Sequence, residues 1–582
     1  MQTSHTPRTR AQESRSAIGR LYIAMRHLFI RGSYKPLGLS GEAMIEALME
    51  LRPEIYGSVT DPERVELDGL FYVFQRLPHG IEECRYIKLI TREGFENTDF
   101  RPIVPSRRRR NCYRIDKEQM FVEMTRGRSD IYDILTHLTF LFIEARKIFH
   151  NSEGHKGNKK REWIMLEEIV AREERGEEFN HEVAYTYLST LLGRTYDETF
   201  AACERFAREP DVNSIFHITY WLGRLTTGEV YEGLDREISF SSALRERIGH
   251  HAYGEVWARN IKNRLEEEGL MGRPLHILSA NLHSVMNCLF AKAALRHKHK
   301  GGDLESLARM LSQSRNQEYR EAVYAYASRH GMTQIDDTSG TNISVQIFDT
   351  GKIEPDLLPP EIRWDPDHIR ENAPVLLVMD YAFGEQAYET MDELLKPLEE
   401  GDLQQKLDVA SIAIMGKAGI LEGGKGDIMV PTAHVFEGTA DNYPFDNDLR
   451  LEDFAGSGLN AFEGPMITVL GTSLQNRDIL DYFLRSSWRA IGLEMEGAHY
   501  QKAIQSASRI RKSINEKVIL RYAYYASDNP LISGHTLASG SLGLEGVKPT
   551  YLITSILLNR VLAPASAEVQ ASSAVSSRNP SA

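Results

Sequence analysis

The residues of this chain whose types and spacing suggest chemistry lie between Trp488 and Pro530. Glu494 and Glu496 end a short apolar run, and Asp528 ends a second run over Val518 to Ala526. The second run is rich in β-branched and aromatic residues, which favour strands. In a parallel α/β sheet, adjacent strand ends open onto the crevice where such folds bind ligands. The spacing therefore predicts carboxylates gathered over one ligand site.

Glu496 has a second distinguishing feature, because Gly497 and Ala498 begin an amphipathic helix directly after it. The macrodipole and the free backbone N–H groups at a helix N-terminus favour an ionised carboxylate. We therefore expect Glu496 to be charged at neutral pH. Taken alone, Glu496 could also be a helix cap and Asp528 a turn former, since acidic residues favour both positions.

Two strand-turn-helix patterns precede this stretch. Val375 to Met379 is a continuous apolar run, as expected for a strand buried on both faces, and Gly384 and a helix from Gln386 to Leu398 follow it. A second strand, Ala410 to Met415, leads into Gly416-Lys417-Ala418-Gly419, and Gly426-Asp427 comes after a short loop. Glycine at such turns allows a ligand to approach the backbone closely.

In this order and spacing, Glu494-Met495-Glu496-Gly497 followed by a helix, a strand and Ser527-Asp528 resembles the signature of the nucleoside phosphorylase and nucleosidase superfamily. The resemblance covers about residues 343–562. In layout it is similar to the branch of AMP nucleosidases and methylthioadenosine/S-adenosylhomocysteine nucleosidases. It implies a C-terminal three-layer α/β domain with a central mixed sheet, preceded by a mainly α-helical domain.

The resemblance also implies roles for individual residues. In the family the Met-Glu pair holds the ribose and the Asp after the Ser protonates the leaving base, so we expect Asp528 and Glu496 to be catalytic. Phe436 or Tyr524 could stack on the base, although aromatic residues are more often part of a core. The expected substrate-binding residues are Glu494, Met495, Gly384, Lys417, Ala418, Gly419, Phe436 and Ser527. The implied activity is cleavage of the N-ribosidic bond of a purine nucleoside or nucleotide, without a cofactor.

Three departures from the family pattern leave alternatives open. Thr472 to Gln475 replaces the usual Ser-Gly-Asp turn, and no first strand carrying a water-activating Glu is recognisable. Asp349, Glu354 and Asp380 are candidates for that base. The nucleophile could therefore be water or phosphate, or the protein could be an inactive nucleotide-sensing or scaffold protein.

The third departure is Lys417, because the family has Ser or Thr at this position. A lysine at the mouth of the pocket could bind a substrate phosphate, together with Lys425, Arg450 and Arg477 from loops of the same domain. It could equally extend to solvent.

Apolar spacing of three and four residues dominates from residue 16 to about residue 329, as in helices over 18–29, 131–149, 184–192 and 275–295. Residues 69–74 and 85–90 are possible strands. We expect a disordered tail over 1–15, a mainly α-helical domain over 16–335, a junction over 336–374, the α/β domain over 375–562 and a disordered tail over 563–582. The length, 582 residues, requires more than one domain.

Composition limits the partners. The chain has 82 Asp and Glu against 69 Lys and Arg, so we expect neither nucleic acid nor membrane as a partner. The run Arg107 to Arg110 could contact an anion or a polynucleotide, but a solvated loop is the favoured interpretation. Four scattered cysteines and unpaired histidines predict no disulfide framework and no metal site. We expect a cytoplasmic homo-oligomer acting on a small molecule.

Overall fold

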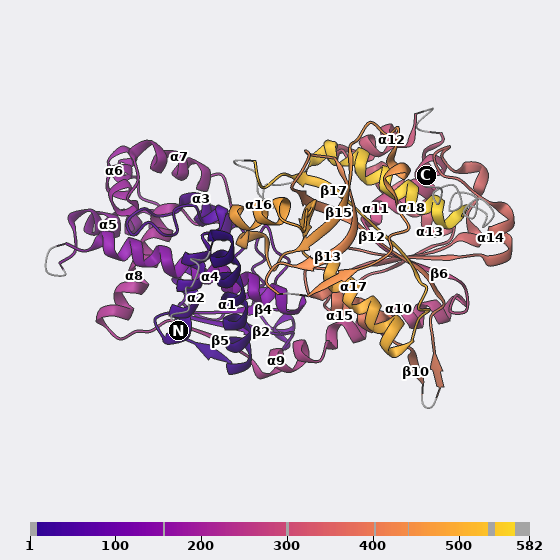
Figure 1. Ribbon diagram of the computed structural model, residues 1–582. Helices are drawn as coiled ribbons and strands as arrows, with labels where there is room; N and C mark the ends of the chain where they lie inside the picture. Colours follow the sequence, from indigo (N-terminus) through magenta and orange to yellow (C-terminus); the bar gives the residue numbers. More distant parts are fainter. Residues whose placement is uncertain are drawn as a thin grey trace, which may run out of the picture. The chain divides into compact units, whose positions relative to one another are not determined.

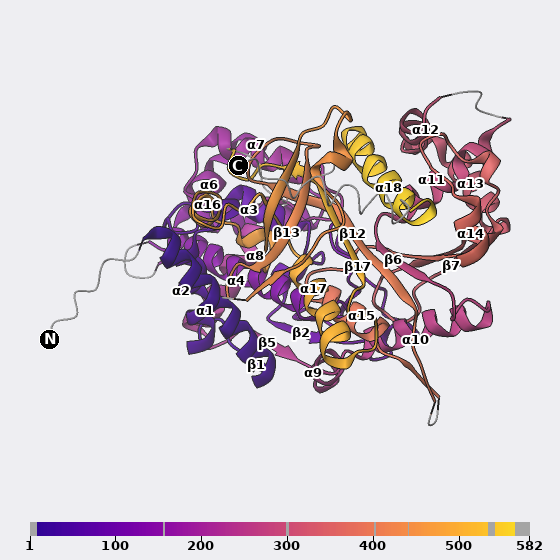
Figure 2. The ribbon, with the colours of Figure 1, turned by 45° about the vertical axis from the view of Figure 1, so that its right-hand side comes forward.

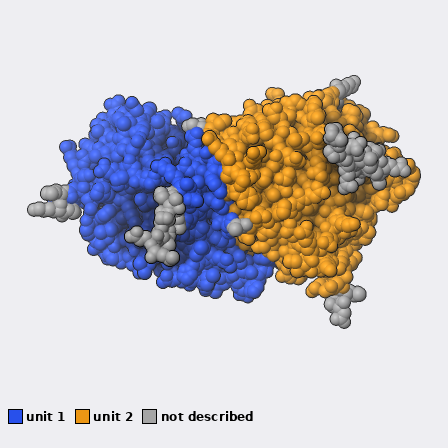
Figure 3. Space-filling view, in the orientation of Figure 1, with its two compact units in different colours: residues 1–252, 437–439, 469–482 blue, residues 253–436, 440–468, 483–582 orange. Residues whose placement is uncertain are grey.

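The structure is a computed structural model that describes residues 9–154, 158–297, 302–400, 403–439, 441–532 and 542–564. The chain forms two compact units, coloured separately in Figure 3. Unit 1 comprises residues 1–252, 437–439 and 469–482, and unit 2 comprises residues 253–436, 440–468 and 483–582. Each unit therefore contains segments from both halves of the sequence.

Unit 1 combines helices with a small sheet whose strands follow the order β1-β5-β2-β4-β3. Strand β2 is parallel to both β4 and β5, and the outer pairs are antiparallel. Its strands are β1 (Ser33–Tyr34), β2 (Tyr86–Ile90), β3 (Cys112–Arg114), β4 (Gln119–Glu123) and β5 (Glu237–Phe240). Its helices are α1 (Arg10–Arg31), α2 (Leu39–Leu51), α3 (Leu67–Phe74), α4 (Gly127–Ser152), α5 (Arg161–Glu174), α6 (His181–Leu192), α7 (Tyr196–Phe206), α8 (Ile215–Tyr231) and α9 (Ser242–Gly249).

Helix α4 is the central element of unit 1. It begins directly after β4, has 26 residues and is buried along most of its length, as in the run from Ile131 to Ala145. A helix that is apolar on more than one face must be covered on several sides. Helices α2, α6 and α8 pack against it. The first two turns of α4, which contain Asp130 and Asp133, are therefore also buried inside unit 1.

Unit 2 is built on a mixed sheet, in which the described strands follow the order β14-β13-β15-β16-β12-β6-β9-β8-β7 and β17 pairs with both β12 and β13. The strands are β6 (Leu275–Ser279), β7 (Met332–Ile335), β8 (Val345–Asp349), β9 (Val375–Met379), β12 (Val409–Ile420), β13 (Ile428–Phe436), β14 (Asn442–Pro444), β15 (Ala461–Thr468), β16 (Gly492–Glu494) and β17 (Ile519–Asp528). A separate hairpin joins β10 (Leu398–Glu400) to β11 (Leu403–Gln405).

Part of this sheet closes on itself. Strand β12 pairs with β17, β17 with β13, β13 with β15, β15 with β16, and β16 with β12 again. Side chains inside such a small closed ring are sequestered from water. The ends of β12, β16 and β17 are held together at one end of this ring.

Helices cover both faces of the sheet of unit 2, as Figures 1 and 2 show. One core packs α11 (Leu282–Leu295), α12 (Leu304–Leu311), α13 (Gln317–Arg329) and α18 (Val547–Leu562) against it. The opposite core packs α10 (Ala252–Glu267), α15 (Gln386–Leu394) and α17 (Gly497–Gln505). Helix α14 (Pro366–Asn372) also belongs to unit 2, whereas α16 (Arg477–Arg485) belongs to unit 1 up to residue 482 and to unit 2 from residue 483. The expected fold class, a three-layer α/β domain with a mixed sheet after a mainly helical region, is confirmed.

The division of the chain differs from the expected one. Unit 2 begins at residue 253 rather than near 336, and residues 275–295, expected to be one helix, are strand β6 and helix α11. Strand β6 is a central strand between β12 and β9. A short, fully buried strand has an apolar run that spacing cannot distinguish from the start of a helix. The sequence analysis therefore left this strand unrecognised.

Two further expectations need correction. Residues 69–74, a possible strand, lie in α3, because their aromatic side chains pack on helices rather than across a sheet. Helix α1 starts at Arg10, capped by the Thr9 hydroxyl, so residues 10–15 of the expected tail are helical. Residues 1–8 and 565–582 of the two expected tails lie outside the described residues.

Candidate active site

The candidate residues converge around the end of β12. Gly419 is the register partner of Leu493 in β16 on one side and of Asp528 in β17 on the other. With a strand spacing of about 4.8 Å, the backbones of these two partners are about 10 Å apart. The sequence placed the carboxylates on adjacent strand ends. The structure instead puts β12, with its Gly-Lys-Ala-Gly run, between them.

Glu496 lies at the N-cap of α17, as the sequence predicted. Its side chain is half-buried, and its Oε1 accepts a hydrogen bond of 2.9 Å from the backbone N–H of Gly384. Gly384 has a φ of 54°, in the left-handed region that glycine adopts without strain. The bond joins two motifs that are 112 positions apart in the sequence.

Glu494 has a different environment. Its Oε1 accepts a 2.5 Å hydrogen bond from the Thr468 hydroxyl, and its Oε2 accepts bonds from the backbone N–H groups of Glu496, at 2.5 Å, and Gly497. Burial, and then the neighbouring Glu496 carboxylate, raise the pKa of Glu494 to about 8. Both oxygens are therefore used to hold the turn that carries Glu496.

Asp528 is the last residue of β17 and is almost completely buried. The Ser527 hydroxyl is 2.5 Å from Asp528 Oδ1 and 3.1 Å from the carbonyl oxygen of Ala418. One hydroxyl donates to a single acceptor at a time, so Ser527 can switch between strand β12 and Asp528. The expected pair Ser527-Asp528 thus contacts the expected Ala418 directly.

Lys417 is exposed, and it pairs in register with Tyr525. The other members of the expected basic cluster are placed differently. Arg450 forms an ion pair of 2.9 Å with Asp446, Arg477 belongs to unit 1, and Lys425 is exposed on the loop after β12. The described contacts bring none of the three to Lys417.

The two aromatic candidates have different surroundings. Phe436, at the end of β13, is half-buried and makes an edge contact with His499, at 4.9 Å between ring centroids. Tyr524 is buried, and its hydroxyl is 3.4 Å from Nε2 of His434, whose pKa burial lowers to about 3. Phe436 is therefore the more accessible ring for a base.

The structure adds residues that the sequence did not indicate. Ser279, at the end of β6, hydrogen-bonds Tyr500 of α17 at 3.0 Å, and Thr468 of β15 both donates to Glu494 and accepts from the Ala498 N–H. A serine closing an apolar run just before the helix cap Asn281 was the available signal for Ser279.

The three candidate bases, Asp349, Glu354 and Asp380, have different surroundings. Asp349 pairs with Arg273 at 2.6 Å and accepts from the backbone N–H of Gly351, and Glu354 is exposed. Asp380 follows β9 directly and lies four residues before Gly384. Of the three, only Asp380 lies at a strand end next to the site.

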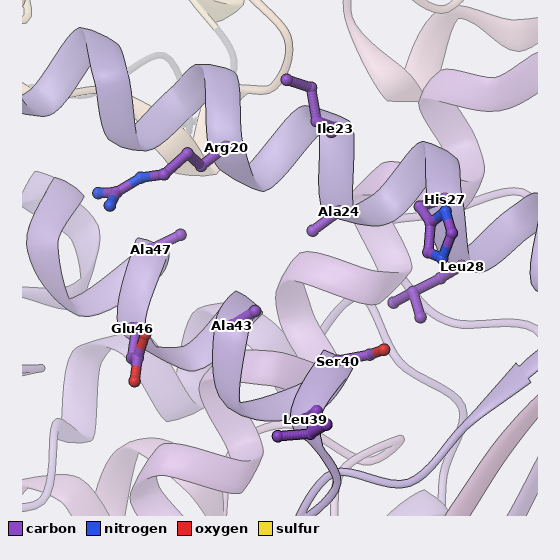
Figure 4. Close-up of a pocket in the computed structure, with 10 residues that line it drawn as sticks. All are labelled: Arg20, Ile23, Ala24, His27, Leu28, Leu39, Ser40, Ala43, Glu46 and Ala47. Carbon is purple, nitrogen blue, oxygen red and sulfur yellow. The ribbon is translucent and has the colours of Figure 1, made fainter.

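Other features of the described residues do not belong to this site. Figure 4 shows a pocket of about 470 Å³ in unit 1, lined by α1 and α2 residues of mixed character: Arg20, Ile23, Ala24, His27, Leu28, Leu39, Ser40, Ala43, Glu46 and Ala47. Glu82, Glu83 and His217 are near enough to share a metal ion, but Arg114 and Asn213 already donate to the two carboxylates. No described helix has the length and apolar character needed to cross a membrane.

The fold and these contacts define the second unit as an α/β domain with carboxylates gathered at strand ends. The chain belongs to a family of unknown function, DUF6909, whose model matches residues 42–208 and 306–563. These two ranges include parts of both units. A search of curated proteins found no match.

Among solved structures, the chain is similar at low level to several enzymes. It shares 12% identity and a TM-score of 0.30 with a Campylobacter jejuni 5'-methylthioadenosine/S-adenosyl homocysteine nucleosidase, covering 49% of this chain and 97% of that one. With the Helicobacter pylori futalosine hydrolase it shares 12% identity and a TM-score of 0.28, covering 50% of this chain and 97% of that one. With the Schistosoma mansoni uridine phosphorylase it shares 12% identity and a TM-score of 0.30, covering 51% of this chain and 92% of that one.

Proposed function

We propose that unit 2 cleaves the N-ribosidic bond of a purine nucleoside or nucleotide and releases the free base. The observation that carries the proposal is the hydrogen bond from the Gly384 N–H to Glu496, which assembles two separate motifs at the strand ends where Asp528 also lies. Ligands of open α/β sheets bind at such strand ends. The sequence motifs supply the chemical roles.

Asp528 is the general acid in this proposal. A purine leaves poorly as an anion, so its ring nitrogen has to be protonated while the ribose develops oxocarbenium character. The Ser527 hydroxyl, 2.5 Å from Oδ1, orients the Asp528 carboxyl group. General acid catalysis contributes a factor of roughly 10² to 10⁴.

Glu496 holds the ribose hydroxyls, because a half-buried carboxylate at a helix N-terminus can accept two hydrogen bonds from a diol. Met495 and the backbone of Ala418 and Gly419 line the sugar, and Phe436 stacks on the base. Glu494 was expected to bind substrate. Its contacts with Thr468 and two backbone N–H groups support a positioning role instead.

The identity of the nucleophile, water or phosphate, decides between a hydrolytic and a phosphorolytic reaction. With a nucleoside as substrate, water gives a nucleosidase that releases ribose, and phosphate gives a phosphorylase that releases ribose 1-phosphate. With a nucleotide, the sugar product also keeps the phosphate group of the substrate. Asp380 is the base that we assign to the hydrolytic version, because it follows β9 near Gly384. The alternative is a catalytically inactive nucleotide-sensing or scaffold protein. We further propose that the enzyme is cytoplasmic and a homo-oligomer.

The test is chromatography of free base after incubation of the full chain with a panel of purine nucleosides and nucleotides, with and without phosphate. We expect base release that Asp528→Asn reduces by roughly 10² to 10⁴ while the melting temperature stays close to that of the parent. Release by Asp528→Asn at the parent rate contradicts the assignment of the acid. No release from any substrate by the parent supports the inactive alternative.

A second arm of the same experiment addresses the substrate class. If Lys417 binds a substrate phosphate, the parent prefers AMP to adenosine, and Lys417→Ala reduces that preference by roughly tenfold or more, the range of a charge-assisted contact. The exposed Lys425→Ala is the matched control. A preference that survives in Lys417→Ala removes Lys417 from the proposed site.

A further inference from the structure

Helices α1 and α2 of unit 1 form an antiparallel pair with one exposed face. Arg20 of α1 forms an ion pair with Glu50 of α2, and Arg31 of α1 donates to the Ser40 hydroxyl of α2 at 3.2 Å. The residue number rises along α1 while that of the α2 partner falls, so the helices run in opposite directions. Beside the Arg20–Glu50 pair lie six exposed residues that we call the α1–α2 face: Ile23, His27 and Ile30 of α1, and Leu39, Ala43 and Glu46 of α2.

The spacing of these residues is that of a helix-packing surface. Positions 23, 27 and 30 of α1 and positions 39, 43 and 46 of α2 follow steps of four and three residues, which place side chains on one side of a helix. Ile23, Ile30 and Leu39 are 67%, 64% and 92% exposed. Single exposed apolar side chains are ordinary, but several on one face of a helix pair are typical of a contact surface.

The α1–α2 face also has a hollow. Figure 4 shows Ala24 of α1 and Ala43 and Ala47 of α2 around a cavity of about 470 Å³, where short side chains leave space between the two helices. The exposed Ile23 and Leu39 border the same cavity. Helices pack by inserting the projecting side chains of one surface into the grooves of the other. A face with projections and a hollow side by side has both parts of such a contact.

The two helices carry opposite charge. Helix α1 contains five arginines and one glutamate, and α2 contains three glutamates and no lysine or arginine. Within the described residues, Glu46 makes no hydrogen bond and no ion pair, although it is only one helical turn from Glu50, the partner of Arg20. The exposed Glu46 carboxylate is therefore available to a cation from outside this copy of the chain.

We propose that the α1–α2 face is the contact surface between two copies of this chain, related by a two-fold axis parallel to the helices. In this arrangement α1 of each copy lies against α2 of the other, and the four helices form an antiparallel bundle in which positive and negative helices alternate. Residues keep their level along the axis. Arg20 then lies within one turn of Glu46 of the partner subunit, and Ile30 packs near Leu39 of the partner subunit.

A second copy fits the charge pattern better than another protein does. A two-fold contact uses the same surface twice, so this surface has to be complementary to itself. A positive helix beside a negative helix meets this condition, whereas an acidic or a basic helix of another protein would match only half of the face. The proposal gives a contact surface to the homo-oligomer proposed above, and it does not depend on the activity of unit 2.

The experiment is sedimentation equilibrium of the full chain over a range of concentrations. We expect a dimer, or a larger oligomer that this contact helps to hold together. Ile23→Gln should raise its dissociation constant by at least about tenfold, because a two-fold contact loses the buried apolar side chain twice. Ile164→Gln is the matched control, since it makes the same substitution at an exposed helix position elsewhere in unit 1. It should associate as the parent does.

Glu46→Lys tests the charge pattern. The exposed Glu46 has no partner in its own copy, so we expect the variant to keep the melting temperature of the parent. It brings a lysine near Arg20 of the partner subunit on both sides of the axis, and the dissociation constant should rise by at least about tenfold. The double variant Arg20→Glu/Glu46→Lys exchanges the two signs, and it should associate more tightly than Glu46→Lys alone.

Two results would overturn the proposal. A parent that sediments as a monomer assigns the α1–α2 face to a different occupant, such as a helix of another protein. An oligomer whose dissociation constant is the same for the parent, Ile23→Gln and Glu46→Lys is held together by a different surface. Base release is measured on the same samples, so that a failure of the assembly proposal and a failure of the proposed activity are distinguished.

Discussion

Two glutamates that stand two positions apart have opposite tasks at the candidate site. Glu494 ends strand β16. Its two oxygens accept hydrogen bonds from the Thr468 hydroxyl and from the backbone N–H groups of Glu496 and Gly497 in the turn after the strand. Glu496 is beyond the strand, at the helix N-cap, where its Oε1 accepts a hydrogen bond from the Gly384 N–H. The sequence analysis placed both glutamates at the end of one short apolar run. The strand ends between them, so the Glu494 carboxylate is buried and the Glu496 carboxylate is half-buried.

Glu496→Gln is therefore expected to weaken both substrate binding and turnover. An amide retains one acceptor oxygen but replaces the other by a donor, which cannot accept from a ribose hydroxyl. A loss of roughly 10 to 100-fold in kcat/KM corresponds to one charge-assisted bond. Steady-state kinetics of base release measure it, with the exposed Glu422→Gln as control. Kinetics like those of the parent would make Glu496 a structural cap.

Glu437 gives a residue-scale prediction about pH. It is 1% exposed, and burial raises its pKa to about 8. In the unfolded chain a glutamate has a pKa of about 4.3, so between about pH 4.3 and pH 8 the folded state holds a proton that the unfolded state has released. This contribution makes stability fall as the pH rises through that window and level off above it.

Glu437→Gln removes the titrating group while keeping the shape of the neutral acid. We expect the variant to be as stable as the parent near pH 4 and more stable at pH 8.5, by up to about 5 kcal/mol. Thermal unfolding of both proteins at the two pH values measures the difference. A variant that is less stable than the parent at pH 8.5 would show that Glu437 is ionised and compensated in the folded state.

At the scale of elements, the sequence was informative where an element has its own local signal. The continuous apolar run 375–379 is strand β9 with the predicted ends, and Gly497 begins α17 as expected. The sequence was uninformative where the pairing of distant strands decides the structure. Nothing local shows that β12 lies between β16 and β17, or that Leu275–Ser279 is a central strand, because both depend on strand partners that are more than 70 positions away in the sequence. Burial of Arg108 and Arg110 depends likewise on Asp130 and Asp133 of α4.

The start of α17 gives the element-scale prediction. A Cβ added at Gly497 would be 2.2 Å from the His434 ring and 2.9 Å from Glu494 Oε1, so β13 and the helix would have to move apart. We expect Gly497→Ala to destabilise the protein by about 1 to 3 kcal/mol, as overpacking does, and to lower kcat/KM because Glu496 moves with the helix.

Gly424→Ala is the control for this variant, since nothing lies within 4 Å of its Cβ position. Melting temperature and base release are measured for both variants. If Gly497→Ala had the stability and activity of Gly424→Ala, the close packing of α17 on His434 would not be what holds Glu496 in place.

At the scale of the whole molecule, the two units are not consecutive in the sequence. Residues 437–439 and 469–482, which follow most of the sheet of unit 2, belong to unit 1. There the Asn476 side-chain amide donates to the Leu51 carbonyl oxygen at 2.7 Å, and the Glu54 N–H donates to the Gln475 carbonyl oxygen at 2.9 Å. The family match includes residues from both units.

A fragment of residues 1–252 should therefore be incomplete. It lacks Leu474, Ile479 and Leu480, which are buried in the full chain, and it leaves the Leu51 carbonyl group without the Asn476 donor. Loss of three buried aliphatic side chains removes about 1.5 to 3 kcal/mol each, which is a large fraction of the stability of a domain. We expect the fragment alone to aggregate or to melt well below the full chain, and to be recovered folded when it is co-expressed with residues 253–582. A fragment 1–252 that is monomeric and melts at the temperature of the full chain would show that segment 469–482 contributes nothing to unit 1.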